Sequence, residues 1–213
     1  MSRALLVLPL ALLLACGPKG SGTTVPTDTA PTINAAPAAV LDGEIVHTAI
    51  SAADVQKVKI RVDADGGIVK QSLYHGEASA LPTKVLELAK TRFPGGTVRH
   101  YETELYADRG RVYEVEVDDG GKLCEVAATP EGALVYVECE LDPTTLSAEL
   151  KAAVEREAPG GKVLEAETKQ GSDIDEVTVE VEVDGRELYL RLKPDGTLVQ
   201  KLRRIPAIVE VPI

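Results

Sequence analysis

Carboxylates are the side chains in this sequence whose spacing could support chemistry. Two segments, 113–118 and 179–184, alternate between apolar and acidic residues, and their glutamates are Glu114, Glu116, Glu180 and Glu182. Paired carboxyl groups can act as general acid and base. Alternation, however, places the acidic side chains of a β-strand on one face and the apolar ones on the other. We therefore predict an exposed sheet face with Arg191 and Lys193 as cross-strand partners, and this face is the predicted partner-binding surface.

The other reactive residue types form no recognisable constellation. His47, His75 and His100 are scattered along the chain, whereas metal ligands are expected to converge. No nucleophile-elbow motif and no glycine-rich phosphate loop occur in the sequence. The Asp-Gly pairs in 63–67 and 118–121 fit hairpin turns better than calcium loops. The sequence therefore predicts no catalytic residues, no metal and no cofactor.

Cys124 and Cys139 flank a predicted hairpin turn at 129–132, and two interpretations of that turn differ in their consequence. With a two-residue turn, Cys124 lies directly opposite Cys139, and a cross-strand disulfide can form. With a type I turn and a bulged glycine, the register moves by one and Cys124 faces Glu138. A proline at the second turn position favours the bulged turn, whereas an oxidising compartment favours the disulfide. The sequence leaves both alternatives open.

The first forty residues predict export and lipid anchoring. An Arg precedes an apolar run over 4–15, which is too short to span a membrane and is typical of a secretory signal. The run ends in Leu-Leu-Ala-Cys, which resembles the lipobox of bacterial lipoproteins, where the Cys carries diacylglycerol. We expect a signal peptide over 1–15, then lipidated Cys16 and a Thr-, Pro- and Ala-rich tether over 16–40. The expected location is a cell-envelope membrane, the outer membrane facing the periplasm.

Composition limits the partners and the core. The formal net charge is -11, with 23 Lys and Arg against 34 Asp and Glu. Because a phosphate backbone is bound chiefly by positive charge, we exclude nucleic acid as the main partner. The chain has one Phe and no Trp, so its core must be aliphatic.

The region after residue 40 contains a duplication. Segment 93–98 matches 158–163 around a shared Pro-Gly-Gly, and 113–118 matches 179–184. Each copy opens with a helical pattern and closes on a hairpin turn that contains proline. Matched landmarks in one order predict two copies of one supersecondary module.

These patterns predict an α+β fold of two tandem helix-on-antiparallel-sheet units, over 41–141 and 142–213. The first helix is expected from Pro82 to Arg92, and the second is expected to start at Pro143 with Asp142 as its cap. A hairpin pattern at 58–69 precedes the first unit without a comparable helix pattern before it. We expect this N-terminal β-hairpin to extend the first sheet.

The residues of the first copy resemble a known family. Pro82 at the helix start, the Pro-Gly-Gly of 94–96, Glu102, the strand 113–117 and the closing Pro-Glu-Gly turn are similar to PepSY-like modules. These modules are related in fold to the beta-lactamase inhibitor protein, itself a tandem of helix-on-sheet units. The resemblance covers roughly 55–205 and implies an exported, non-enzymatic module that in parts of the family binds or restrains peptidases. The second copy departs from the pattern because it lacks the tyrosine of the first.

Together these features predict a membrane-anchored, non-catalytic lipoprotein that binds another envelope protein or peptide, as a peptidase inhibitor or an envelope sensor. Two alternatives stay open. One is a carboxylate-dependent envelope hydrolase that uses residues such as Glu102 and Glu167. The other is a structural envelope lipoprotein without a discrete ligand.

Overall fold

The computed structural model describes residues 43–51 and 55–208. The predicted signal peptide, Cys16 and the tether lie outside these residues. No helix within the described ranges has the length and apolar character needed to cross a membrane.

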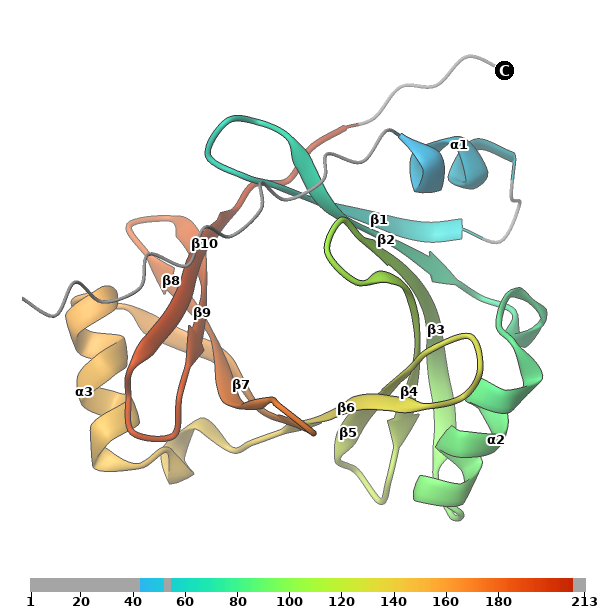
Figure 1. Ribbon diagram of the computed structural model, residues 1–213. Helices are drawn as coiled ribbons and strands as arrows, with labels where there is room; N and C mark the ends of the chain where they lie inside the picture. The colour runs from blue at the N-terminus through green and yellow to red at the C-terminus, as the bar shows by residue number, and fades with distance from the viewer. Residues whose placement is uncertain (1–42, 52–54, 209–213) are drawn as a thin grey trace, which may run out of the picture. The chain divides into compact units, whose positions relative to one another are not determined.

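Ten strands form one antiparallel sheet in which each strand pairs with the next along the chain (Figure 1). They are β1 (Val55–Val62), β2 (Ile68–His75), β3 (Thr97–Tyr106), β4 (Gly110–Asp118), β5 (Leu123–Ala128), β6 (Leu134–Glu140), β7 (Lys162–Gly171), β8 (Asp175–Val183), β9 (Arg186–Leu192) and β10 (Leu198–Arg204). The other described elements are short: α1 (Glu44–Ser51), α2 (Thr83–Arg92), α3 (Ala148–Glu157) and the 3-10 turns η1 (Ala78–Ala80) and η2 (Pro143–Thr145).

The prediction of an α+β fold with two tandem helix-on-sheet units was wrong. The strand β6 pairs with β7, from Tyr136 opposite Gly171 to Glu140 opposite Glu167, so the two repeats share one continuous sheet. The fold is mostly β, a ten-stranded half-barrel with a few short helices (Figure 1). Pairing β6 with β7 satisfies backbone groups that two separate units would each leave on an open edge.

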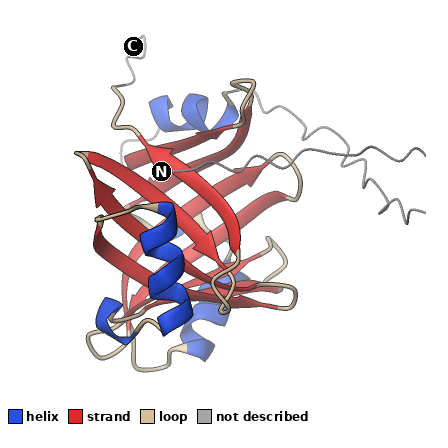
Figure 2. Ribbon diagram, turned by 90° about the vertical axis from the view of Figure 1, so that its left-hand side faces the viewer, coloured by secondary structure: helices blue, strands red, loops and turns tan. Residues whose placement is uncertain are grey.

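The helices cover the outer face of the sheet, where the apolar side chains of the strands gather. Beneath α2, Val85 and Ala89 pack in one cluster with Val115, Val117 and Val126. Helix α3 lies across the outer face of the sheet (Figure 2). A second cluster of the same kind packs beneath it, and its members include Leu150, Val154, Val177, Val179 and Val181. The predicted alternation in 179–184 is therefore confirmed, since Val179 and Val181 are fully buried and Glu182 is exposed.

Helix α3 begins later than predicted. Asp142 does accept a hydrogen bond from the Thr144 N–H at 2.8 Å, but it caps the 3-10 turn η2. The α-helix starts after Ser147, whose hydroxyl accepts the Leu150 N–H at 3.2 Å. A second serine-type cap inside the expected helix thus moves its start from Pro143 to Ala148.

Helix α1 is an element that the sequence pattern did not predict. It precedes β1 and packs on β2, with Ile45 only 2% exposed. The Ile45 N–H donates to the Gln71 side-chain oxygen at 3.2 Å, which fixes the start of the helix to the sheet. The hairpin of β1 and β2 lies at the edge of the sheet, where β2 pairs with β3.

Candidate functional site: a charged cavity on the inner face of the sheet

The inner face of the curved sheet encloses a cavity of about 590 Å³, which we call the acidic cavity. Strand alternation places the valines under the helices and therefore turns the polar side chains of the same strands inward. Nine carboxylates line the space: Glu102, Glu104, Glu114, Glu116, Glu125, Glu138, Glu165, Glu167 and Glu180. Five cations line it as well: Lys57, Lys59, Lys70, Lys169 and Arg204. The lining thus carries an excess of four negative charges when all these groups are ionised.

A buried network centres on Glu104, which is 1% exposed. Its carboxylate pairs with the Lys70 ammonium and accepts the Tyr106 hydroxyl at 2.6 Å. The Tyr136 hydroxyl lies within hydrogen-bond distance of both Glu104 and Glu114. Every buried side-chain nitrogen or oxygen in the described part of the chain has a partner, so this network is saturated.

A second buried group surrounds Glu138. Its carboxylate pairs with the Lys169 ammonium at 2.6 Å and accepts the Thr178 hydroxyl at 2.9 Å. The same ammonium lies 3.5 Å from the centre of the Tyr136 ring, a cation–π contact. Glu167 lies 3.1 Å from the Thr178 hydroxyl. Lys169 therefore balances only part of the negative charge at this point.

Three carboxylates of the acidic cavity, Glu116, Glu125 and Glu165, have neither an ion pair nor a hydrogen bond among the residues that the structure describes. Glu125 lies directly opposite Glu116 on β4 and opposite Glu138 on β6. Like charges placed opposite each other destabilise a sheet. Glu116, Glu125 and Glu165 are therefore the carboxylates of the cavity that a positively charged group would stabilise most.

The crowding of carboxylates changes their titration. Burial, with the nearby Glu138 and Glu165, raises the pKa of Glu167 to about 8. Burial and Glu114 raise the pKa of Glu102, and burial with the same neighbour raises the pKa of Glu125 well above its usual range. Part of the lining is therefore protonated at neutral pH, and an incoming cation would favour the ionised form.

Most of the glutamates predicted to lie on an exposed sheet face are enclosed in the structure. Glu114 is buried, 3% exposed, while Glu116 and Glu180 line the acidic cavity and only Glu182 of the four is exposed. The expectation of an open face was wrong because the sheet curves around its own polar side. Glu180 pairs with Arg204 of β10, not with a neighbouring strand's cation.

The two predicted cross-strand cations bind a different carboxylate. Arg191 makes two hydrogen bonds to Glu176, of 2.7 and 3.1 Å, and Lys193 lies 3.7 Å from the same group. Glu176 is buried, which the alternation count did not indicate because it lies at the start of β8.

Glu102, Glu104 and Glu114 are the described residues that could hold a metal ion by geometry. One oxygen from each lies within 4.8 Å of the others. The Lys70 ammonium already pairs with Glu104 at this place and supplies the positive charge that a metal ion would bring. Glu102 and Glu167, the residues of the hydrolase alternative, line the same cavity from β3 and β7.

The three histidines lie in different surroundings. His47 is exposed on α1, and His100 lines the acidic cavity. His75 is buried, with its ring nitrogen 3.0 Å from the Thr103 hydroxyl. Among the described residues, the three histidines therefore do not converge on a common metal site.

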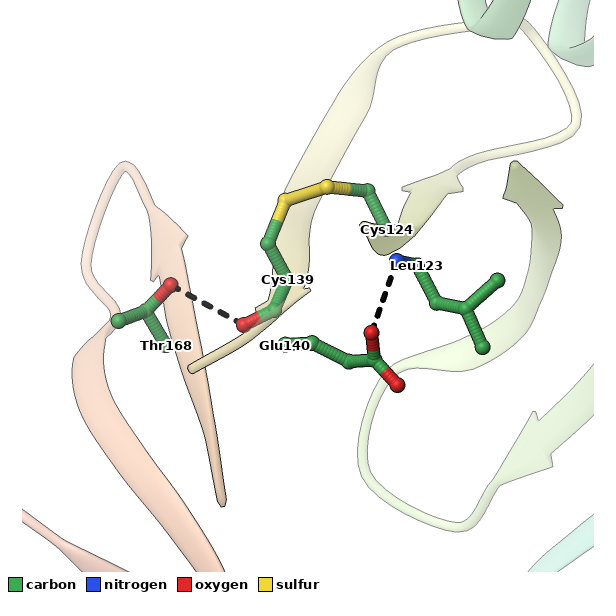
Figure 3. The surroundings of a disulfide bond; sticks show 5 residues. All are labelled: Leu123, Cys124, Cys139, Glu140 and Thr168. Atoms are coloured by element: carbon green, nitrogen blue, oxygen red, sulfur yellow. Dashed lines mark hydrogen bonds between the residues drawn. A yellow bond between two sulfur atoms is a disulfide. The ribbon is translucent and has the colours of Figure 1, made fainter. Parts of the chain in front are cut away.

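Cys124 and Cys139 form a disulfide between β5 and β6, with an S–S distance of 2.06 Å (Figure 3). The flanking strands are also held by side chains: the Leu123 N–H donates to Glu140 at 3.0 Å, and the Thr168 hydroxyl donates to the Cys139 carbonyl at 3.4 Å. The disulfide thus links β5 to β6, the strand of the first repeat that pairs with β7.

The register around the disulfide combines both alternatives left open by the sequence. The Thr129 N–H donates to the Ala133 carbonyl and Gly132 has a φ of 84°, as in the bulged turn. A second irregularity follows, since Ala128 faces Leu134 but Ala127 faces Tyr136, and the residue between those partners is skipped. This bulge restores the register, so Cys124 lies directly opposite Cys139.

Comparisons with known proteins give partial matches of structure only. No protein-family model and no curated protein sequence matches the chain. A DUF2874 family protein from Bacteroides ovatus is 18% identical, with a TM-score of 0.47 over 58% of this chain and 87% of its own. A candidate periplasmic protein from Bacteroides eggerthii is 16% identical, with a TM-score of 0.47 over 58% of this chain and 88% of its own. A BLIP-like protein from Bacteroides fragilis is 18% identical, with a TM-score of 0.46 over 62% of this chain and 93% of its own. This chain is thus similar to a BLIP-like protein over part of its length, and none of the three matches bears on a PepSY module or on a lipid.

Proposed function

We propose that this chain is a lipid-anchored, non-catalytic binding module of the bacterial cell envelope, whose acidic cavity takes a positively charged segment of another envelope protein. One observation carries the proposal: nine carboxylates face five cations in one cavity of about 590 Å³. The anchor is the predicted lipid on Cys16, and the predicted tether of 16–40 gives the module its reach.

Electrostatics favour a basic partner segment. Glu116, Glu125 and Glu165 form no ion pair with a described residue, and burial together with neighbouring carboxylates raises the pKa of Glu125 and of Glu165. A Lys or Arg side chain placed among them relieves this repulsion, and the gain is larger in a partly enclosed cavity than in water. A surface with an excess of one charge also speeds the encounter with a partner of the opposite charge.

The aromatic residues of the cavity suit the same ligand. The Tyr74 ring already has the ammonium groups of Lys57 and Lys59 at 4.9 Å from its centre. The Arg204 guanidinium lies at the same distance from the Tyr189 ring. Rings in this cavity thus accept cations on their faces, and a partner's Lys or Arg can exchange with those of the chain.

Binding of a labelled Lys- and Arg-rich decapeptide, followed by fluorescence anisotropy at low salt, tests the proposal. The triple variant Glu116→Gln, Glu125→Gln and Glu165→Gln is expected to weaken binding at least tenfold. A control variant with the same number of Glu→Gln changes outside the cavity, Glu87→Gln, Glu131→Gln and Glu182→Gln, is expected to bind like the parent. Equal weakening in both variants would mean that only overall charge matters, and the cavity would lose its assigned role.

The hydrolase alternative is favoured by one observation, namely that Glu102 and Glu167 line a common cavity and both have raised pKa values. A carboxyl group that is protonated near neutral pH can serve as a general acid. Hydrolysis of envelope peptides or glycans by the parent protein, lost in Glu102→Gln or Glu167→Gln, would overturn the non-catalytic assignment. We expect no such activity.

A further inference from the structure

A smaller cavity of about 250 Å³ lies at the other end of the inner face. Arg61, near the end of β1, lines this space, whereas Lys57 near the start of the same strand lines the acidic cavity. Lys70, Tyr136, Lys169 and Tyr189 line both cavities and lie between them. The charged side chains around the smaller cavity are Arg61, Lys70, Asp108, Arg109, Lys169 and Arg191. Because five of the six are cations, we call it the basic cavity.

Most of these cations already have a carboxylate partner. Lys70 pairs with Glu104, Lys169 with Glu138, Arg109 with Asp108 and Arg191 with Glu176. Arg61 differs, because it has no ion pair and no hydrogen bond to any residue in the described part of the chain. It is only half-buried, so its guanidinium can reach both the cavity and solvent.

The position of Arg61 in the sheet is unfavourable by itself. It lies directly opposite Lys70 in the pairing of β1 with β2. Like charges at directly opposite positions of an antiparallel pair repel each other. Burial, together with the charges of Arg61 and Lys169 and against the opposing effect of Glu114 and Glu102, lowers the pKa of Lys70 to about 8. Glu104 forms an ion pair with Lys70 and none with Arg61, so the charge of Arg61 has no carboxylate partner among the described residues.

The basic cavity also contains a neutral hydrogen-bond donor, the Tyr189 hydroxyl. The Tyr189 hydroxyl makes no hydrogen bond to another described residue, although its ring lines the basic cavity. Arg61 is close enough to lower the pKa of Tyr189 against the opposing effect of burial. A guanidinium, an ammonium and a free hydroxyl therefore surround one small space.

We propose that the basic cavity binds an oxyanion, a carboxylate or a phosphate group, held by Arg61 and Lys70 with the Tyr189 hydroxyl as a further donor. An Arg fork matches the two oxygens of either group, and an anion placed between Arg61 and Lys70 converts their repulsion into two attractions. The volume is below that of ordinary drug-sized sites, so the cavity takes a small anion or the acidic end of a larger molecule. Lys70 and Tyr189 also line the acidic cavity, whereas Arg61 does not, so the proposal rests on Arg61 and not on the acidic cavity's proposed partner.

Titration with inorganic phosphate and, separately, with acetate at constant ionic strength tests the site. The chain has six Tyr and no Trp, and Tyr106, Tyr136 and Tyr189 line this cavity, so tyrosine fluorescence and amide chemical shifts both report on it. We expect saturable binding of at least one anion, weakened at least tenfold by Arg61→Gln and several-fold by Tyr189→Phe. Arg203→Gln, an exposed arginine of β10, is the matched control and should leave the affinity unchanged.

Binding of phosphate alone would identify a phosphate group, and binding of acetate alone a carboxylate. Absence of saturable binding for both anions, or the same loss in Arg61→Gln and Arg203→Gln, would overturn the site. Affinity of Arg61→Gln for the basic decapeptide is expected to equal that of the parent, so failure of the anion site leaves a different signature from failure of the acidic cavity.

Discussion

Gly96 lies against the side chain of Val117 so closely that a β-carbon on the glycine would overlap the valine Cγ1. Gly161 has the same relation to Val181 in the second repeat. These pairs join the two landmarks that the duplication contains, the Pro-Gly-Gly segment after each helix and the alternating strand that follows. The glycine lets the chain leave the helix directly above the strand that the helix covers.

We predict that Gly96→Ala destabilises the protein by about 1–3 kcal/mol, because the added methyl group overfills the contact with Val117. Gly95→Ala is the control, since a β-carbon there meets nothing within 4 Å and the backbone is not left-handed. Urea denaturation monitored by circular dichroism measures both. Equal stability of the two variants would contradict the role of the contact.

The local features of the fold could be predicted from the sequence because they depend on neighbouring residues. Alternation put Val179 and Val181 on the buried face, and the proline with the glycines ended α2 at Arg92. The pairing of β6 with β7 could not be predicted in this way, because it depends on which sheet edges meet after each repeat has formed.

The curvature of the sheet could not be predicted from the sequence either, and so the enclosure of the carboxylates in a cavity could not be predicted. Alternation correctly separated Glu114 from Val115, but a flat sheet would leave Glu114 in solvent, whereas the curved one buries it against Tyr136. The register of the cysteines depended on a bulge after the turn, which the turn residues do not encode. The second repeat has the same bulge, since Leu198 faces Leu192 but Gln200 faces Arg191.

The buried valines of β8 provide a direct test of the core. We expect Val181→Asp to cost roughly 3–5 kcal/mol, because it places an unpaired charge among apolar side chains beneath α3. Glu182→Lys, one residue further on, should change stability by less than about 0.5 kcal/mol, since the side chain is exposed. Thermal unfolding compares the two, and similar melting temperatures would show that the assignment of faces is wrong.

The disulfide is expected to stabilise the sheet. It closes a loop with a sequence separation of 15, for which the loss of chain entropy in the unfolded state gives about 3 kcal/mol. Cys139→Ser, or dithiothreitol added to the parent, should lower the free energy of unfolding by a similar amount. Free thiols are counted in the Cys16→Ser variant, so that only Cys124 and Cys139 can react. No free thiol should react in the denatured, unreduced protein, and two reactive thiols would disprove the bond.

Membrane anchoring is predicted to depend on a single thiol. Cys16→Ala should abolish membrane association and leave unprocessed precursor or soluble protein, because only a thiol at this position can take the lipid. Fractionation of cells with and without detergent measures the effect. A variant that still needs detergent for extraction, with its signal peptide removed, would refute lipid attachment at Cys16.

The carboxylates of the acidic cavity should make the protein less stable as the pH rises. Burial and neighbouring glutamates raise the pKa of Glu167 from 4.5 to about 8, and the pKa values of Glu102 and Glu125 are shifted in the same direction. Between pH 4.5 and 8 the folded state therefore binds more protons than the unfolded state, so the free energy of unfolding falls as protons are removed. This is the reverse of a salt-bridged carboxylate, whose lowered pKa stabilises the folded state at high pH. The lowered pKa of Lys70 acts only above about pH 8 and does not alter this window.

We expect the melting temperature to decrease from pH 5 to pH 7.5 and the decrease to be smaller in Glu167→Gln. The exposed Glu87→Gln should follow the parent, and a melting temperature that rises over this range would show that the cavity carboxylates are not strained by one another.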